Sequence, residues 1–360
     1  MKRIFHSAAA FAALLSLAGC EGWLGVKEKP ALPGKRISVL ALETALKSDP
    51  RISDLAVRLP RPVVNKDWPQ AGGVASHAMH HLSAKGGLSR AWEVDIGDGS
   101  DDETQLLAQP VVANGRVFTM DAKAEVRAFD VTTGDRLWRR KLESKSDQGG
   151  ILGAGIGYEG GRLFATTGFA QVFALDAKSG REIWRRRLSG PMRAPPTIAG
   201  GRVFVITVSN ELVALNAQDG SVLWTHVGLP EIAGLIGAAS PAVAGSVVVA
   251  PFSSGELVAL RIENGRQVWT ESLTAVRRAN TAATLAHIRG RPVIDRGRVI
   301  AISNSGRHVA IDLRTGNRIW ERNIGGIHAP WVAGSFIYVM SSSGELVCLT
   351  RRSGAIRWVR

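Results

Sequence analysis

The sequence predicts an all-β fold, a propeller of four-stranded antiparallel sheets, and three observations support this prediction. A short pattern recurs in which a small residue is followed two positions later by Asp or a substitute, six later by Gly and ten later by Trp. Successive Trp residues of the pattern lie 38 to 51 residues apart, a period typical of repeat arrays and propellers. The stretches between them contain short β-type runs and no helical pattern, which favours four-stranded sheets arranged radially.

Each part of the pattern has a structural interpretation. In "ALDAKSGREIW" (174–184), Gly180 supplies the positive φ that a tight turn requires, and Asp176 can bond the backbone of that turn. Ala174 leaves room for the neighbouring sheet, and Trp184 offers a large apolar ring with an N–H that can reach an adjacent backbone. Because the Trp residues recur at regular intervals, a structural role is favoured over a platform on which a ligand stacks. We therefore expect these residues to dock neighbouring sheets: Trp92, Trp138, Trp184, Trp224, Trp269, Trp320 and Trp358.

Composition sets the broad class of the protein. Of 360 residues 45% are hydrophobic, which excludes a disordered chain, and the formal net charge is +14. Such a charge suits an anionic membrane surface or an acidic partner. Only two Cys residues are present, so a disulfide framework is not expected.

The first twenty residues have the features of a bacterial secretion signal. A basic start is followed by an apolar run too short to favour a membrane span, and Leu17-Ala18-Gly19-Cys20 resembles a lipobox. We expect a signal peptide over 1–19, a lipid on Cys20, a tether with a short extended or helical segment over 20–62, and the propeller over 63–360. An ordinary signal peptide with a chance Cys is the alternative. Export makes nucleic acid an improbable partner.

Together, the repeat, the lipobox and the segment "DWPQAGGVASHAMHHL" (67–82) resemble the BamB family within the propellers related to PQQ enzymes, and the segment is especially similar to alphaproteobacterial members. The resemblance covers most of residues 60–360. It implies a non-catalytic lipoprotein of the outer-membrane β-barrel assembly machinery, anchored on the periplasmic face of the outer membrane. Its implied partners are the periplasmic (POTRA) domains of BamA, other assembly subunits and unfolded barrel precursors.

The number of blades is a separate question. BamB-like propellers have eight blades, whereas six full repeats and the lone Trp92 segment are visible here. This count predicts that blades are missing after Arg360, and a tight ring of six or seven blades is the competing interpretation.

Catalytic chemistry has little support in the sequence. No acidic cluster at metal-ligand spacing is apparent, and "GAGIG" (153–157) is not followed by a helix that would bind phosphate. His77, His80 and His81 have no nearby ligand to complete a metal site, so we favour a structural role and expect no metal and no cofactor. A PQQ-dependent dehydrogenase and a cell-wall polysaccharide-binding lipoprotein remain the alternative functions.

Long connectors between blades are the expected binding surface, because binding residues concentrate in loops on a rigid scaffold. The connectors 225–241 and 271–292 combine apolar and basic residues. In the BamB family the corresponding loops bind BamA. The apolar part matches that pattern better than the charged part, because basic residues stand in the second connector where well-known members have acidic ones; packing of the loops on each other is the alternative. The candidate partner-binding residues are Leu229, Ile232, Leu235, Ile236, His287 and Arg289.

Overall fold

The named strands of the protein form six four-stranded antiparallel sheets, each built from four consecutive strands. The computed structural model describes residues 46–84, 86–102, 104–143, 153–231, 235–274 and 286–360. The sheets are numbered blades 1 to 6 in chain order, and they confirm the predicted all-β, propeller-like fold. The expected signal peptide, Cys20 and Ile232 lie outside the described residues.

Each blade runs from an inner strand to an outer strand. Blades 1 and 2 consist of β1 (Val111–Ala113), β2 (Arg116–Met120), β3 (Glu125–Asp130), β4 (Arg136–Lys141), β5 (Gly153–Glu159), β6 (Arg162–Thr167), β7 (Gln171–Asp176) and β8 (Glu182–Arg187). Blades 3 and 4 consist of β9 (Thr197–Ala199), β10 (Arg202–Ile206), β11 (Glu211–Asn216), β12 (Val222–Val227), β13 (Ala242–Ala244), β14 (Val247–Pro251), β15 (Glu256–Arg261) and β16 (Gln267–Ser272). Blades 5 and 6 consist of β17 (Val293–Asp295), β18 (Arg298–Ile302), β19 (His308–Asp312), β20 (Arg318–Arg322), β21 (Trp331–Ala333), β22 (Phe336–Met340), β23 (Leu346–Thr350) and β24 (Ile356–Val359).

The strand register explains the spacing of the repeat. In blade 2, Ala174 lies directly across from Trp184, and a β-bulge follows between Ala174 and Leu175. The equivalent small residue faces the equivalent Trp, with a bulge after it, in the other five blades. Between the paired residues, Asp176 Oδ1 accepts a hydrogen bond from the Ser179 amide, and Gly180 has a φ of +71°. The ten-residue interval is therefore one hairpin with one bulge.

Neighbouring blades are joined by the repeated Trp residues. The indole N–H of Trp184 donates to the carbonyl oxygen of Ala217 in blade 3 at 3.1 Å, and its ring lies over Gly220. A Cβ on Gly220 would be 2.6 Å from the Trp184 ring, so this Gly supplies both the turn conformation and the space for the ring. The same contact, with nitrogen-to-oxygen distances of 2.8 to 3.1 Å, is made by Trp92, Trp138, Trp224, Trp269 and Trp320. Docking by Trp358 stays a prediction; its ring lies 6.0 Å from the Tyr338 ring of its own blade.

Trp92 differs from the other Trp residues in its local backbone. Its indole bonds to Val131 and its ring covers Gly134 in blade 1. No strand is assigned around Trp92, because no described segment pairs with its backbone. Trp92 therefore makes the docking contact with blade 1 although no described sheet contains it.

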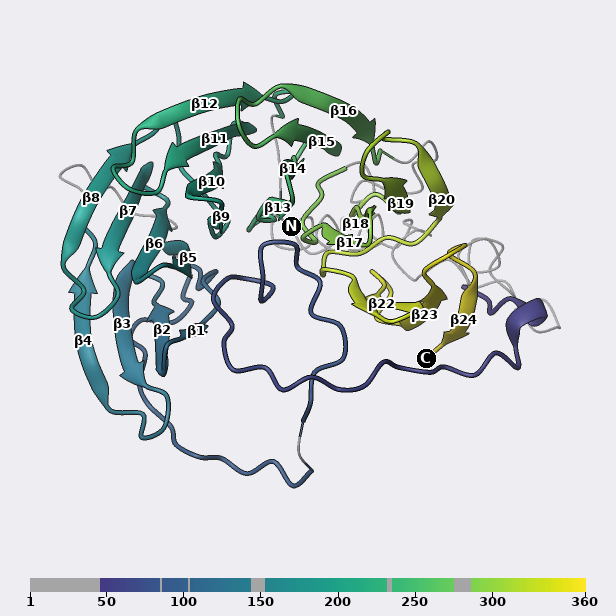
Figure 1. Ribbon diagram of the computed structural model, residues 1–360, viewed down its shortest axis with the longest axis horizontal. Helices are drawn as coiled ribbons and strands as arrows, with labels where there is room; N and C mark the ends of the chain where they lie inside the picture. Colours follow the sequence, from purple (N-terminus) through teal and green to yellow (C-terminus); the bar gives the residue numbers. More distant parts are fainter. Residues whose placement is uncertain (1–45, 85, 103, 144–152, 232–234, 275–285) are drawn as a thin grey trace, which may run out of the picture. The chain divides into compact units, whose positions relative to one another are not determined.

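A single segment, residues 67–81, contacts the inner part of all six blades and is called here the hub segment. In blade 1, Trp68 pairs with Val112 through two backbone hydrogen bonds. The remaining contacts are Pro69 with Tyr158 in blade 2, Gln70 with Ile198 in blade 3, Ala75 with Val243 in blade 4, Ser76 with Ile294 in blade 5 and His80 with Trp331 in blade 6. Figure 1 shows this purple segment passing inside the curve of the sheets. The hub segment therefore links blades that are distant in sequence.

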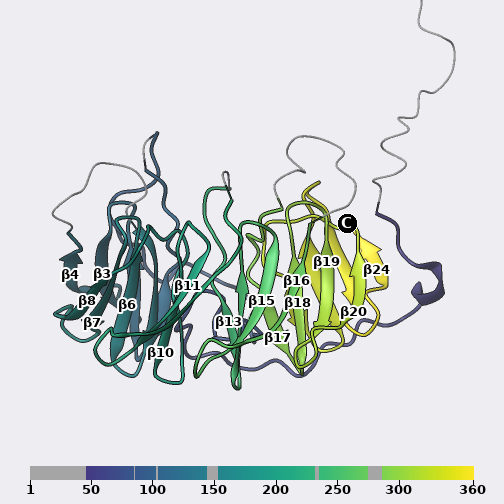
Figure 2. The same ribbon diagram turned by 90° about the horizontal axis from the view of Figure 1, so that it is seen from above.

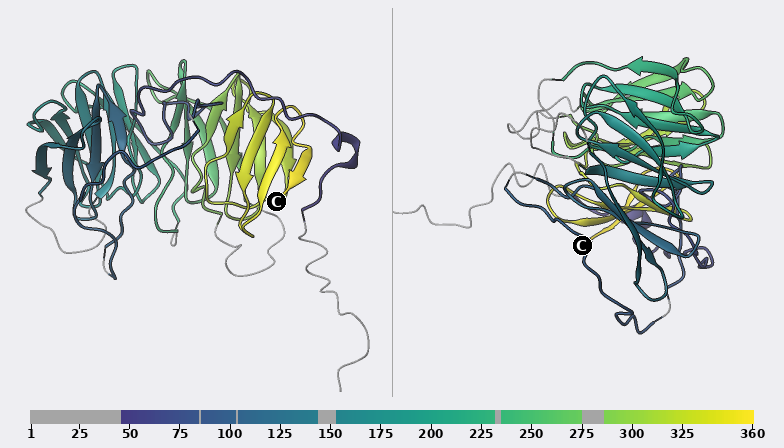
Figure 3. Two further views of the ribbon diagram at one scale, coloured as in Figure 1. Left: turned by 90° about the horizontal axis from the view of Figure 1, so that it is seen from below. Right: turned by 90° about the vertical axis from the view of Figure 1, so that its left-hand side faces the viewer.

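The blades stand next to one another in chain order, with inner strands toward the hub segment and outer strands on the rim (Figure 1). The side views show the strands of adjacent sheets running in similar directions (Figures 2 and 3). Before the first sheet, the described chain contains one short 3-10 helix, η1 (Pro50–Ile52), whose Asp49 cap donates its backbone N–H to Ile356 in blade 6. No helix in the described ranges is long and apolar enough to cross a membrane.

Candidate partner-binding site

The candidate site lies on the connectors that follow blades 3 and 4. The first runs from the end of β12 to β13 and the second from the end of β16 to β17, so the connectors begin at 228 and 273, a few residues later than the sequence suggested. The described parts, 228–231, 235–241, 273–274 and 286–292, contain no named strand or helix. Their conformation is therefore set by side-chain and isolated backbone contacts with the blades.

The start of the first connector is fixed by Asn210, in the turn between β10 and β11. The Asn210 side-chain amide donates to the Leu229 carbonyl at 2.8 Å, and its oxygen accepts from the backbone and hydroxyl of Ser253 in blade 4. The Leu229 amide in turn donates to Glu256 at 2.6 Å. These bonds hold the backbone of Leu229 while 60% of the residue's surface stays exposed.

The two connectors contact each other at His287. The backbone N–H of Leu235 donates to His287 Nδ1 at 3.0 Å, which requires this ring nitrogen to be unprotonated. The adjacent Gly237 has a φ of +83°, and the Arg289 side chain packs against it, with Nε 3.3 Å from the position of an added Cβ. Leu235 is half-buried by this packing, whereas Ile236 is 54% exposed.

His287 itself is only 5% exposed. Burial, with the nearby Arg289 and Arg193 guanidinium groups, lowers the pKa of His287 to about 4, so the ring is neutral at physiological pH. His287 therefore positions the first connector and does not present a charge to solvent, and its part in partner binding stays a prediction. Its neighbour Arg289 is half-buried.

Beneath the connectors lies a cavity of about 290 Å³. Its wall includes Leu235 and His287 from the connectors, Arg193 from the preceding inter-blade loop, and Asn210 and Ser253 from the turns of blades 3 and 4. Exposed apolar side chains at the edge of a partly charged hollow are typical of protein-binding surfaces.

The structure thus joins four of the predicted residues, Leu235, Ile236, His287 and Arg289, and places Leu229 at the start of the same connector. Sequence analysis missed Asn210 in the turn before β11, Glu256 at the start of β15, and Arg193 in the loop between β8 and β9. Asn210 has a φ of +59°, at a turn position where blades 4 to 6 have Gly and blades 1 and 2 have Ala, also at positive φ. An Asn at such a position is the one signal that could have singled it out.

The three His residues of the hub segment each contact a different part of the protein. His77 Nδ1 lies 2.7 Å from the Pro292 carbonyl, His80 lies 3.3 Å from Asp295, and His81 Nδ1 lies 2.7 Å from the Pro60 carbonyl. Burial first, and Arg291 second, lower the pKa of His77 to about 3. Within the described part of the chain, no three His, Cys, Asp or Glu side chains are grouped as metal ligands.

Fold and site together define a tryptophan-docking β-propeller whose candidate site is a surface on inter-blade connectors. A family model described as outer membrane protein assembly factor BamB matches residues 78–152 and 122–360. The chain therefore belongs to the BamB family of outer membrane protein assembly factors.

Individual relatives agree with this assignment. The BamB of Yersinia pestis is 29% identical over 276 residues, covering 75% of this chain and 70% of that protein. The BamB of Marinobacter adhaerens is 29% identical over 65 residues, a stretch that spans 18% of this chain and only 17% of that relative.

Two solved structures share the fold. The crystal structure of BamB from Moraxella catarrhalis matches with a TM-score of 0.64 and 22% identity, over 73% of this chain and 78% of that chain. A europium-containing methanol dehydrogenase matches with a TM-score of 0.61 and 12% identity, over 82% of this chain and 78% of that chain. At these identities both likenesses concern the fold alone.

Proposed function

We propose that this protein is a non-catalytic scaffold of the outer-membrane β-barrel assembly complex, and that the connectors after blades 3 and 4 bind the periplasmic domains of BamA. In this proposal Cys20 carries a lipid that anchors the protein to the periplasmic face of the outer membrane. Other assembly subunits and unfolded barrel proteins are further partners. Membership of the BamB family supports the proposed place in the assembly complex, and the exposed residues of the connectors support the proposed binding surface.

One observation carries the proposal: Leu229 and Ile236 are exposed on the first connector, whose backbone is hydrogen-bonded at Leu229 and at Leu235. Exposed apolar side chains contribute most to binding when they are fixed before the partner arrives, since little conformational entropy is then lost. The bonds from Asn210 and His287 provide this fixation. Arg193 and Arg289 beside the cavity would contact polar groups at the edge of such an interface.

The test uses the double variant Leu229→Asp with Ile236→Asp and the purified periplasmic domains of BamA. We expect affinity to fall by more than ~30-fold, the effect of losing central apolar anchors. The control is Leu137→Asp with Ile319→Asp, two exposed aliphatic residues on the outer strands of blades 1 and 5. The control should bind as the wild type does, and both variants should unfold at nearly the wild-type temperature. Equal binding by the wild type and the connector variant would refute the proposal.

A further inference from the structure

The outer strands of the six blades occupy equivalent places but differ in charge. In blades 1 to 4, the first and third residues after the docking Trp lie on the outer strand and are exposed. In β4 these are Arg139 and Lys141, and in β8 they are Arg185 and Arg187; all four are exposed. We call these four residues the basic rim. Figure 1 shows β4 and β8 next to each other on the outside of blades 1 and 2.

The other blades show that the fold does not require cations at these positions. The equivalent pairs are Thr225 and Val227 in blade 3, Thr270 and Ser272 in blade 4, and Glu321 and Asn323 in blade 5. Protection of an exposed sheet edge is a general use of charged residues, but β12 and β16 are also outermost strands and lack them at these positions. The four cations are thus a specific feature of blades 1 and 2.

Few acidic groups neutralise the basic rim. Arg185 pairs with Glu182 at 2.7 Å, and Glu182 also lies 3.4 Å from Arg140. Among the ion pairs of the described residues, none involves Arg139, Lys141 or Arg187. Lys141 faces Glu125 across the sheet, but that carboxylate binds Arg127. A net positive surface therefore remains.

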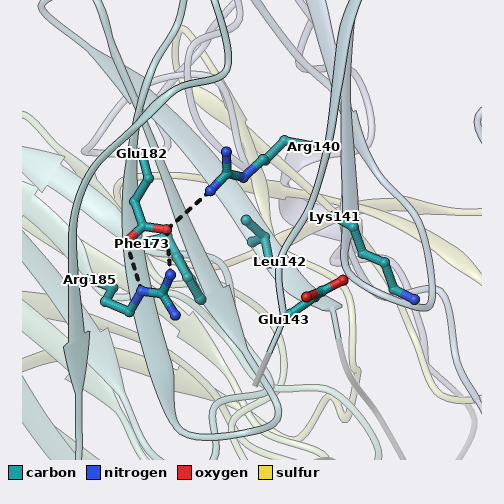
Figure 4. Close-up of a pocket in the computed structure, with 7 residues that line it drawn as sticks. All are labelled: Arg140, Lys141, Leu142, Glu143, Phe173, Glu182 and Arg185. Atoms are coloured by element: carbon teal, nitrogen blue, oxygen red, sulfur yellow. Dashed lines mark hydrogen bonds and ion pairs between the residues drawn. The ribbon is translucent and has the colours of Figure 1, made fainter. Parts of the chain in front are cut away.

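A hollow of about 540 Å³ lies between the two strands. Figure 4 shows Arg140 and Arg185 directed toward Glu182 on one side, with Lys141 and Glu143 on the other. Leu142 and Phe173 form its apolar lining, and the Arg185 guanidinium lies 5.4 Å from the centre of the Phe173 ring. Three cations and two carboxylates thus border this hollow, whose apolar floor is almost fully buried.

We propose that the basic rim docks on an anionic phospholipid membrane surface. The cations are spread over two sheets, whereas a groove for an extended acidic peptide would align them along one strand. The exposed aliphatic residues Leu137 and Ile183 stand on the same outward faces as the cations. Cations beside aliphatic side chains match the phosphate and acyl layers of a membrane interface. This surface uses outer strands of blades 1 and 2, so the proposal does not depend on partner binding by the connectors.

The experiment measures binding of the full chain to phospholipid vesicles, with Cys20→Ser present throughout so that no lipid is attached. The vesicles are phosphatidylcholine alone or phosphatidylcholine mixed with phosphatidylglycerol. The test variant gives blades 1 and 2 the residues of blade 4: Arg139→Thr, Lys141→Ser, Arg185→Thr and Arg187→Ser. The matched control removes four exposed cations elsewhere: Arg266→Ser, Arg296→Ser, Arg314→Ser and Arg352→Ser.

A basic residue near an anionic membrane strengthens binding about fivefold. We therefore expect the test variant to lose at least ~10-fold of the partition onto phosphatidylglycerol vesicles, and the control to change less than ~3-fold, because its cations lie away from the rim. Added salt should weaken wild-type binding. Residues 1–45 are common to every variant, so their contribution cancels.

Three results would overturn the proposal: no wild-type preference for phosphatidylglycerol, wild-type binding by the test variant, or an equal loss in the control. Capture of polyglutamate but not of anionic vesicles, lost in the test variant, would assign the basic rim to acidic polypeptides instead. Thermal unfolding of each variant identifies any loss caused by misfolding, and the single-blade variant Arg139→Thr with Lys141→Ser then repeats the vesicle assay in a milder form.

Discussion

The Trp contact with a following blade is built in the same way six times, five times between neighbouring blades and once from the segment around Trp92 to blade 1, whereas the surface formed by the connectors after blades 3 and 4 occurs once. At each blade contact a Trp ring covers a Gly and donates to a carbonyl oxygen. At the connectors, Asn210 holds the backbone of the exposed Leu229, and His287 holds the backbone of Leu235, next to the exposed Ile236. The comparison teaches that residues which recur in every repeat stabilise the fold. Residues that depart from the repeat are the better candidates for binding.

The largest expected effect comes from removing a Trp at a blade contact. Trp184 is buried, and Trp184→Ala leaves a cavity beside Phe164 and Gly220, so we expect unfolding free energy to fall by about 3–5 kcal/mol. Chemical denaturation measures this loss. Under native conditions the folded fraction should still bind BamA domains. A loss below ~1 kcal/mol would contradict the role of the Trp contacts, because such a loss is typical of surface sites.

A smaller effect is expected from Gly variants, which separate the need for a left-handed turn conformation from the need for space beneath the Trp ring. Gly220→Ala places a methyl group 2.6 Å from the Trp184 ring at a φ of +71°, whereas Gly160→Ala has a φ of +56° and no atom within 4 Å. We expect Gly160→Ala to cost about 1–2 kcal/mol for the left-handed conformation alone. Gly220→Ala should cost more, because the ring must also move.

Equal losses in the two Gly variants, measured by the same denaturation experiment, would mean that the ring contact adds nothing. That result would leave turn conformation as the whole explanation for Gly in the repeat.

The smallest effect concerns pH and occurs in both regions. Burial lowers the pKa of His308, 5.2 Å from Trp320 in blade 5, and of His287 in the connectors, each to about 4. The unfolded pKa is about 6.5, so between pH 6.5 and 4 the unfolded chain binds these protons and the folded chain does not. Stability should therefore fall as pH falls through this window.

The variant His308→Leu tests this assignment, since it removes one of these buried rings. At pH 5 the number of protons taken up on unfolding should drop by about one, measured from the slope of stability against pH. An unchanged slope would show that the folded protein protonates His308 freely.

The sequence was sufficient to predict the four-stranded blades, the turn Gly and the docking Trp, because each depends on a pattern of residues a few positions apart. It was not sufficient for the hub segment, whose contacts join residues 67–81 to strands up to 251 positions away. The burial of His287 was missed for the same reason: its hydrogen-bond donor, Leu235, is 52 positions distant. Exposure of Leu229 and Ile236 follows the loop pattern, but the Asn210 bonds that fix Leu229 depend on how two blades pack.

The most direct test of this separation measures unfolding free energy and affinity for the BamA periplasmic domains on Trp184→Ala and on Leu229→Asp with Ile236→Asp, side by side. The account predicts that the first variant loses stability and keeps its affinity when folded, and that the second loses affinity and keeps its stability. If the connector variant lost stability to the same degree as Trp184→Ala, the connectors would be part of the packing of the propeller and the central claim would be wrong.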